Sequence, residues 1–219
     1  MIRAVLLDLY GTLVRGGGPR REVALREMAR ALRLDGSAFV ELFTASASER
    51  MRGTLGTIEE TLDALAQQLG ADPSPSEVRL AALTWQRLHH AILWPAESTL
   101  ATLDALRDRG VKLALITNCS QETEIQWPKQ PLASRMDAVV FSCKERLLKP
   151  EAAIYLKACE ALGVTPQECL YVGDGSDNEL RGAVAVGMRT IRTLEYAYSD
   201  PTWTGESIGK LREIIGLLE

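Results

Sequence analysis

Several residue types are scarce in this chain of 219 residues. Its four cysteines form no CxxC pair and no regular spacing, so we expect reduced thiols and not a disulfide framework. The 29 aspartates and glutamates outnumber the 25 lysines and arginines, and the net charge of −4 argues against a surface for nucleic acid or an anionic membrane. No apolar run approaches the ~20 residues of a membrane span. The N-terminus enters an apolar run without a signal-peptide pattern, so we expect a cytoplasmic protein.

Short apolar runs alternate with helical segments over most of the chain. The run 4–7 is rich in valine and leucine, which is typical of a buried strand. Further strands are predicted at 111–117, 138–142, 169–173 and 189–194, and helices at 96–109, 150–162, 178–186 and 206–218. A helix can occupy only part of 120–135, because two prolines interrupt it. This alternation predicts an α/β fold built on a doubly wound parallel sheet.

The segment between the first two strands is different, because no good strand appears in it. Helices are predicted near 20–33, 37–51, 57–69 and 76–93, and the third opens with a capping box in which Thr57 precedes Glu60. A glycine-rich joint, 15–20, precedes them. We therefore expect a helical domain, 16–94, inserted into an α/β domain made of 1–15 and 95–219.

Polar side chains stand where three of the predicted strands end. They are Asp8, Thr117 with Asn118, and Asp174. In open α/β sheets, ligands bind outside the carboxyl ends of the strands. Two carboxylates that converge there raise each other's pKa unless a cation is present, and Mg²⁺ takes oxygen ligands from carboxylates and from substrate phosphate.

Four stretches around these residues resemble the motifs of the haloacid dehalogenase (HAD) superfamily. In chain order they are DLYGTL at 8–13, ITN at 116–118, KP at 149–150 and GDGSDNE at 173–179. The four motifs occur in register, and the resemblance extends to about residue 194. It implies a Rossmann-like HAD core. It also implies that the helical insert after the first motif, 16–94, is a cap that closes over the active site.

The resemblance also implies a role for each matching residue. Asp8 would be the nucleophile that forms an aspartyl-phosphate. Asp8 and Asp174 would bind Mg²⁺ together with the main-chain carbonyl of Tyr10. Thr117 and Asn118 would donate hydrogen bonds to the transferring group.

The resemblance implies further roles for residues of the KP motif at 149–150 and of the GDGSDNE motif at 173–179. Lys149 would neutralise the charge of the nucleophile and of the group in transfer. Either Asp177 or Glu179 could hold metal-bound water, although each could equally cap the following helix.

Tyr10 departs from the phosphatase pattern. In phosphatases of this superfamily the residue two after the nucleophile is usually a second Asp, which protonates the leaving group. A tyrosine, with a pKa of about 10, is a poor substitute. The DLYGTL form is similar to that of the L-2-haloacid dehalogenases, which need neither metal nor leaving-group acid, yet the motif at 173–179 keeps the metal-binding acids. Arg50 and Arg52, in the predicted cap, could bind the carboxylate of a haloacid, bind the anionic part of a phosphate ester, or simply be surface arginines.

Because two carboxylates facing one centre require a cation, we predict a Mg²⁺-dependent phosphatase. Its partner would be a small molecule, a phosphorylated metabolite. The alternatives are an L-2-haloacid dehalogenase-like hydrolase and a protein that binds a phosphorylated ligand without turning it over. The sequence leaves the physiological substrate, the pathway and the oligomeric state open.

Overall fold

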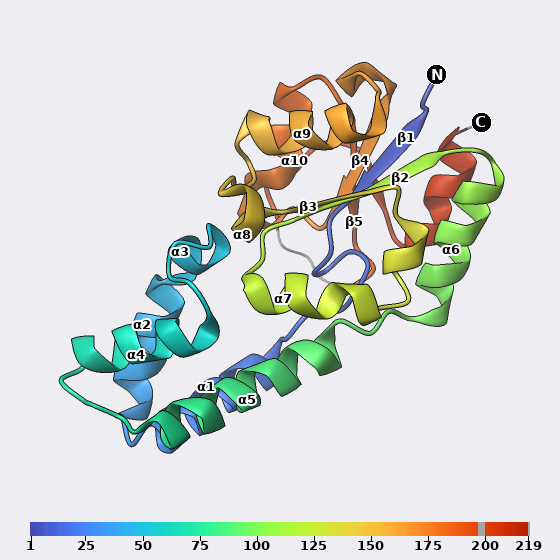
Figure 1. The fold of residues 1–219 in the computed structure, drawn as a ribbon. Helices are drawn as coiled ribbons and strands as arrows, with labels where there is room; N and C mark the ends of the chain where they lie inside the picture. Colours follow the sequence, from blue (N-terminus) through green and yellow to red (C-terminus); the bar gives the residue numbers. More distant parts are fainter. Residues whose placement is uncertain (197–199, 219) are drawn as a thin grey trace.

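The computed structural model describes residues 1–196 and 200–218, and a parallel six-stranded sheet lies at its centre (Figure 1). The sheet order is β3-β2-β1-β4-β5-β6, and every neighbouring pair is parallel. The strands are β1 (Ala4–Leu7), β2 (Lys112–Thr117), β3 (Ala138–Phe141), β4 (Cys169–Gly173), β5 (Arg189–Thr193) and β6 (Ser207–Ile208). The predicted α/β fold with a doubly wound parallel sheet is confirmed.

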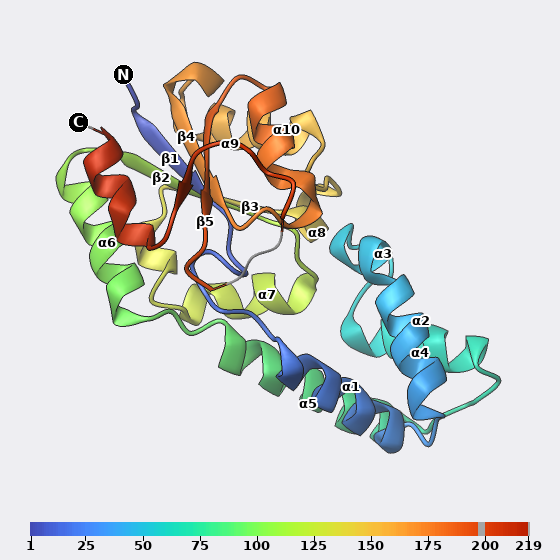
Figure 2. The ribbon, with the colours of Figure 1, turned by 180° about the vertical axis from the view of Figure 1, so that it is seen from behind.

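Helices cover both faces of this sheet. Successive residues of β1 point to opposite faces. Leu7 packs into a core with α6 (Glu97–Asp108) and the C-terminal 3₁₀ helix η5 (Leu211–Leu218), whereas Leu6 packs into a core with α9 (Ala152–Leu162) and α10 (Glu179–Ala185). All four residues of β1 are fully buried, as a parallel strand covered on both faces requires. Figure 2 shows the same layers from behind.

The helices between β1 and α6 form a group of their own, which we call the cap helices. They are α1 (Pro19–Ala31), α2 (Gly36–Ala45), α3 (Ala47–Met51), α4 (Ile58–Gln68) and α5 (Pro75–Ile92). Their apolar side chains, among them Phe39, Phe43 and Trp85, form a core separate from those of the sheet. Figures 1 and 2 show α1 and α5 side by side where the chain leaves and re-enters the sheet region. The domain boundaries at 15/16 and 94/95 stay a prediction.

Some elements differ from their predicted form. The helix expected over 37–51 is broken into α2 and α3 at Ser46, whose hydroxyl donates a 2.9 Å hydrogen bond back to the carbonyl of Phe43. The helix expected over 206–218 is instead the short strand β6, which pairs with β5 and buries Ile208, followed by η5. The capping box is present, with Thr57 and Glu60 bonding each other's backbone N–H.

The segment after β2 is irregular, as its prolines predict. It contains α7 (Gln121–Gln126) and the 3₁₀ turns η1 (Trp127–Lys129) and η2 (Ala133–Arg135). The short elements elsewhere are α8 (Ser142–Glu145) after β3, and η3 (Pro166–Glu168) and η4 (Ser176–Asn178) on either side of β4.

Over residues 1–196 and 200–218, none of the helices combines the length and apolar character that crossing a membrane requires.

Candidate active site

The three polar strand ends lie side by side, because β1 pairs with β2 on one side and with β4 on the other. Asp8 follows β1, Thr117 ends β2, and Asp174 follows β4. Asp8 and Asp174 are only 5% and 3% exposed, and a carboxylate oxygen of one lies within 4.8 Å of a carboxylate oxygen of the other. The structure thus brings together the residues that the strand ends suggested.

The ammonium group of Lys149 lies inside this cluster. Its Nζ is 2.5 Å from Asp8 Oδ1 and 2.5 Å from Glu179 Oε2, and all three side chains are buried. Burial alone would lower the pKa of Lys149, but the two carboxylates outweigh it and the net pKa is raised. Lys149 is therefore held as a cation against the proposed nucleophile.

Glu179 is fully buried and belongs to the same cluster. It accepts hydrogen bonds from the hydroxyl of Tyr171 (2.6 Å) and from the backbone N–H of Gly175 (3.0 Å). Burial, together with the charge of Asp8, raises the pKa of Glu179 to about 7. Glu179 lies in the first turn of α10, and its side chain makes no capping hydrogen bond to the described residues of that helix.

A turn of unusual backbone shape places Glu179 there. Asp177 and Asn178 both adopt left-handed conformations, with φ of 56° and 57°. Asn and Asp are the residues besides glycine that tolerate this region best. The side chain of Asp177 accepts a 2.9 Å hydrogen bond from Asn118, so this acid lies outside the buried cluster and ties two of the site loops together.

One oxygen from each of Asp8, Asp174 and Glu179 lies within 4.8 Å of the other two. An all-oxygen donor set of this kind suits a hard divalent cation such as Mg²⁺. The net negative charge of the cluster also favours a cation, because three carboxylates face one ammonium group. The residues therefore fit a metal centre.

Thr117 and Asn118 differ in how much of their hydrogen-bonding capacity is used. Thr117 Oγ1 is buried and has no hydrogen-bond partner among the described residues, so its hydrogen-bonding capacity is unused. Asn118 Nδ2 donates to Asp177 and to the main-chain carbonyl of Lys149, and its Oδ1 accepts the main-chain N–H of Lys149. The side chain of Asn118 therefore fixes the backbone that carries Lys149.

Gly11 lets the loop after β1 approach Asp174. Its φ is +84°, and a Cβ at this position would overlap Asp174 Oδ2. Gly16 has a similar φ of +80°, but its Cβ would meet only Tyr10 atoms at 3.8 Å.

We predict that Gly11→Ala lowers kcat at least about tenfold, because the new methyl group displaces Asp174, whereas Gly16→Ala does not. Both variants should lose roughly 1–2 kcal/mol of stability from the left-handed backbone alone. Steady-state kinetics and thermal unfolding of the two variants check this. Equal kcat values for the two would show that the crowding against Asp174 is unimportant.

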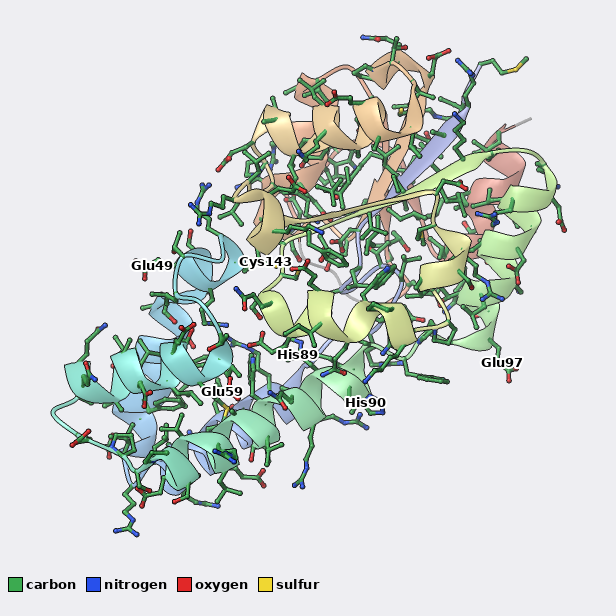
Figure 3. The ribbon with its side chains drawn as sticks, viewed as in Figure 1. Glu49, Glu59, His89, His90, Glu97 and Cys143 are labelled. Carbon is green, nitrogen blue, oxygen red and sulfur yellow. The ribbon has the colours of Figure 1, made fainter. Side chains whose placement is uncertain are left out.

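The hydroxyl of Tyr10 points to the cap side of the site. It is 2.8 Å from Thr123 Oγ1 and 3.5 Å from His89 Nδ1, and Figure 3 shows His89 on the side of α5 toward α7. Burial raises the pKa of Tyr10 above its ordinary value of 10, so the phenol keeps its proton at neutral pH. Burial lowers the pKa of His89 to about 4, so the imidazole is neutral.

The two arginines predicted in the cap occupy different surroundings. Arg50 is 7% exposed and lines a cavity of about 190 Å³ between the cap helices and the core. Arg52 does not line this cavity; it forms a salt bridge with Glu151 and donates a 3.0 Å hydrogen bond to the carbonyl of Arg146. Arg52 therefore connects α3 to the core, and a substrate-binding role for it stays an untested prediction.

Sequence reasoning missed Tyr171 and His89. Tyr171 lies in β4, where its pattern is that of a buried strand residue, and only the turn at 177–178 brings a carboxylate to its hydroxyl. His89 lies on a cap helix without other ligands at metal spacing, and only the contact of α5 with α7 brings it to Tyr10. No local signal could have found either contact.

Comparisons with known proteins agree with this architecture. Residues 2–187 match the family model of the haloacid dehalogenase-like hydrolases. The chain is 32% identical over 210 residues to a glyceraldehyde 3-phosphate phosphatase of Methanopyrus kandleri, covering 91% of this chain and 87% of the relative.

Two solved structures share the fold. A HAD phosphatase from Thermococcus onnurineus superposes with a TM-score of 0.72 at 24% identity, covering 99% of this chain and 98% of that one. The L-2-haloacid dehalogenase of Xanthobacter autotrophicus, with chloropropionic acid covalently bound, superposes with a TM-score of 0.66 at 20% identity, covering 100% and 98%. A phosphatase and a dehalogenase thus share this fold, so the fold does not distinguish phosphate-ester hydrolysis from dehalogenation. The family model spans most of the chain, and the superfamily resemblance is confirmed: this protein is a hydrolase that belongs to the haloacid dehalogenase-like hydrolase family.

Proposed function

We propose that this hydrolase is a Mg²⁺-dependent phosphatase that acts on a small phosphorylated metabolite through an aspartyl-phosphate on Asp8. The observation that carries the proposal is the buried cluster of Asp8, Asp174 and Glu179, in which the ammonium of Lys149 contacts Asp8 and Glu179. A metal-free dehalogenase has no need of Asp174 at this place. The phosphatase name of the relative from Methanopyrus kandleri supports the same choice.

In the first step, a carboxylate oxygen of Asp8 attacks phosphorus and the bond from phosphorus to the ester oxygen breaks. The leaving group departs with the electron pair of that bond as an alkoxide, which takes a proton from solvent water to become the alcohol. Lys149 orients Asp8 through its 2.5 Å contact and offsets the negative charge. The hydroxyl of Thr117, which has no partner among the described residues, donates to a phosphoryl oxygen.

In the second step, water attacks the phosphorus of the aspartyl-phosphate, the bond to Asp8 breaks, and inorganic phosphate leaves. Bound by Asp8, Asp174 and the main-chain carbonyl of Tyr10, Mg²⁺ would neutralise phosphoryl charge during both steps. Asn118 acts as a positioning residue, because it holds the main chain of Lys149.

The first test is hydrolysis of p-nitrophenyl phosphate and of a panel of phosphate esters. We expect turnover with Mg²⁺ and loss of nearly all of it in EDTA, restored when excess Mg²⁺ is added. Turnover of no ester under any condition would contradict the phosphatase proposal. Turnover that is unchanged in EDTA would contradict its metal dependence.

Tyr10 supports a second candidate, an L-2-haloacid dehalogenase-like hydrolase. In that reaction Asp8 attacks carbon and halide leaves as an anion, so the phenol of Tyr10, which keeps its proton, is no handicap. Chloride release from L-2-chloropropionate in EDTA would favour the dehalogenase hypothesis.

The third hypothesis is a protein that binds a phosphorylated ligand without turnover. A phosphorylated ligand that binds in Mg²⁺ and is recovered unhydrolysed would favour it.

The proposal also covers the role of the cap helices and the location of the protein in the cell. We propose that the cap helices, within a domain of 16–94, close over the site on the α/β domain of 1–15 and 95–219. We also propose a cytoplasmic location, where small phosphorylated metabolites are available.

A further inference from the structure

The cavity between the cap helices and the core borders the proposed phosphate site through Tyr10 and Asn118. Its volume is about 190 Å³, and Tyr10 and Asn118, which follow Asp8 and Thr117 closely in the chain, form part of its wall. Arg21 of α1 and Arg50 of α3 line the cavity from the cap. The two guanidinium groups therefore lie on the cap side of a cavity whose core side is formed by neighbours of the proposed phosphate site.

The guanidinium group of Arg50 is buried without a counter-charge in ion-pair contact. Its Nε donates to Ser46 Oγ (3.1 Å), its Nη2 donates to the carbonyl of Phe43 (2.9 Å), and its Cζ lies 3.9 Å from the centre of the Phe43 ring. These partners are uncharged, and among the described residues no carboxylate lies within ion-pair distance of Arg50 or Arg21. The same residues leave Nη1 without a hydrogen bond.

The wider surroundings leave this end of the cavity positive. Burial lowers the pKa of Arg50 to about 10, and the nearby charge of Arg21 contributes, so Arg50 is still a cation at neutral pH. Glu122 of α7 is the nearby carboxylate that acts on Arg50, but it accepts a hydrogen bond from Ser120. Two cations against one carboxylate leave a net positive charge, and a buried cation without a paired anion is costly unless a ligand supplies one.

We propose that the substrate is a short phosphomonoester whose opposite end is a carboxylate, bound by Arg50 and Arg21. The inference rests on the proposed function for the phosphate end. The cavity is smaller than the ~300–1,000 Å³ of sites for drug-sized ligands, so it suits a chain of two or three carbons. A planar carboxylate matches the fork of N–H groups that a guanidinium presents.

The test separates binding from turnover by using the Asp8→Asn protein in Mg²⁺. Calorimetry compares 2-phosphoglycolate and 3-phosphoglycerate, which end in a carboxylate, with glycerol 3-phosphate, which ends in a neutral alcohol. We expect the two acids to bind about 10- to 100-fold more tightly, the range for a hydrogen bond to a charged group. Adding Arg50→Gln should remove most of this preference, and Arg50→Lys should restore part of it.

Arg26→Gln is the matched control, because Arg26 lies on the same helix as Arg21 but is exposed and paired with Glu22. It should keep the preference for the acids. Thermal unfolding shows whether the Arg50 variants fold, and Arg21→Gln provides a second test if they do not. The same panel is then assayed for turnover by the unmodified protein.

The outcomes distinguish the two proposals. Selective binding of the acids without turnover by the unmodified protein would overturn the phosphatase proposal and support the carboxylate site. Equal affinity for acids and alcohol, or a preference that survives Arg50→Gln and Arg21→Gln in folded protein, would overturn the carboxylate site even if esters are hydrolysed.

Discussion

Replacing Asp8 with asparagine is expected to lower kcat toward phosphate esters by roughly 10⁴–10⁶-fold, the range found when a member of a nucleophilic catalytic unit is removed. An amide oxygen cannot attack phosphorus as a carboxylate does, so the aspartyl-phosphate does not form. The fold should survive, because asparagine keeps the shape of the side chain and Lys149 retains its 2.5 Å contact with Glu179. Steady-state kinetics with p-nitrophenyl phosphate and Mg²⁺ measures the loss.

Asp63→Asn is the control for this variant. Asp63 is an exposed residue of α4, so the same chemical change there should leave the rate within about twofold, as expected of a surface substitution. An Asp8→Asn protein that is folded and keeps more than about one tenth of the unmodified rate would show that Asp8 is not the nucleophile. The proposed mechanism would then fail at its first step.

Replacing Tyr10 with aspartate is expected to raise kcat toward alkyl phosphates about 10²-fold, the lower end of what general acid–base catalysis contributes. Burial raises the pKa of the Tyr10 phenol, so it is a poor proton donor to a departing alkoxide. An aspartate two residues after the nucleophile would supply that proton. Turnover of p-nitrophenyl phosphate should change much less, because p-nitrophenolate leaves without a proton.

Tyr10→Phe is the matched control, since it removes the hydroxyl and its 2.8 Å contact with Thr123 without adding an acid. It should not raise the alkyl phosphate rate. The measurement is the ratio of kcat for glycerol 3-phosphate to kcat for p-nitrophenyl phosphate in the three proteins. A folded Tyr10→Asp protein with an unchanged ratio would mean that the leaving group receives its proton from another source.

The core of the site could be predicted because strand ends are simple to recognise. A buried apolar run followed by a polar residue fixes where the run stops, and parallel pairing of β1 with β2 and β4 then places Asp8, Thr117 and Asp174 at one edge. Lys149 could be predicted only from the resemblance, because a lysine before a proline has no distinctive local pattern.

The remaining features depend on contacts between elements that no local pattern encodes. Glu179 enters the site because Asp177 and Asn178 both adopt left-handed backbone, which the sequence permits but does not require. The different surroundings of Arg50 and Arg52 follow from their places at the end of α3, since residues two apart on a helical turn do not share a face. Strand β6 has two residues, too few for a periodic signal.

The most direct test of the account is a crystal of the protein grown or soaked with Mn²⁺, measured for anomalous scattering. Mn²⁺ takes the same oxygen ligands as Mg²⁺ and its position can be seen directly. We predict one strong anomalous peak bonded to carboxylate oxygens of both Asp8 and Asp174, at about 2.0–2.3 Å. A clear structure at saturating Mn²⁺ with no peak there, or with the Lys149 ammonium or packed side chains filling that position, would contradict the account.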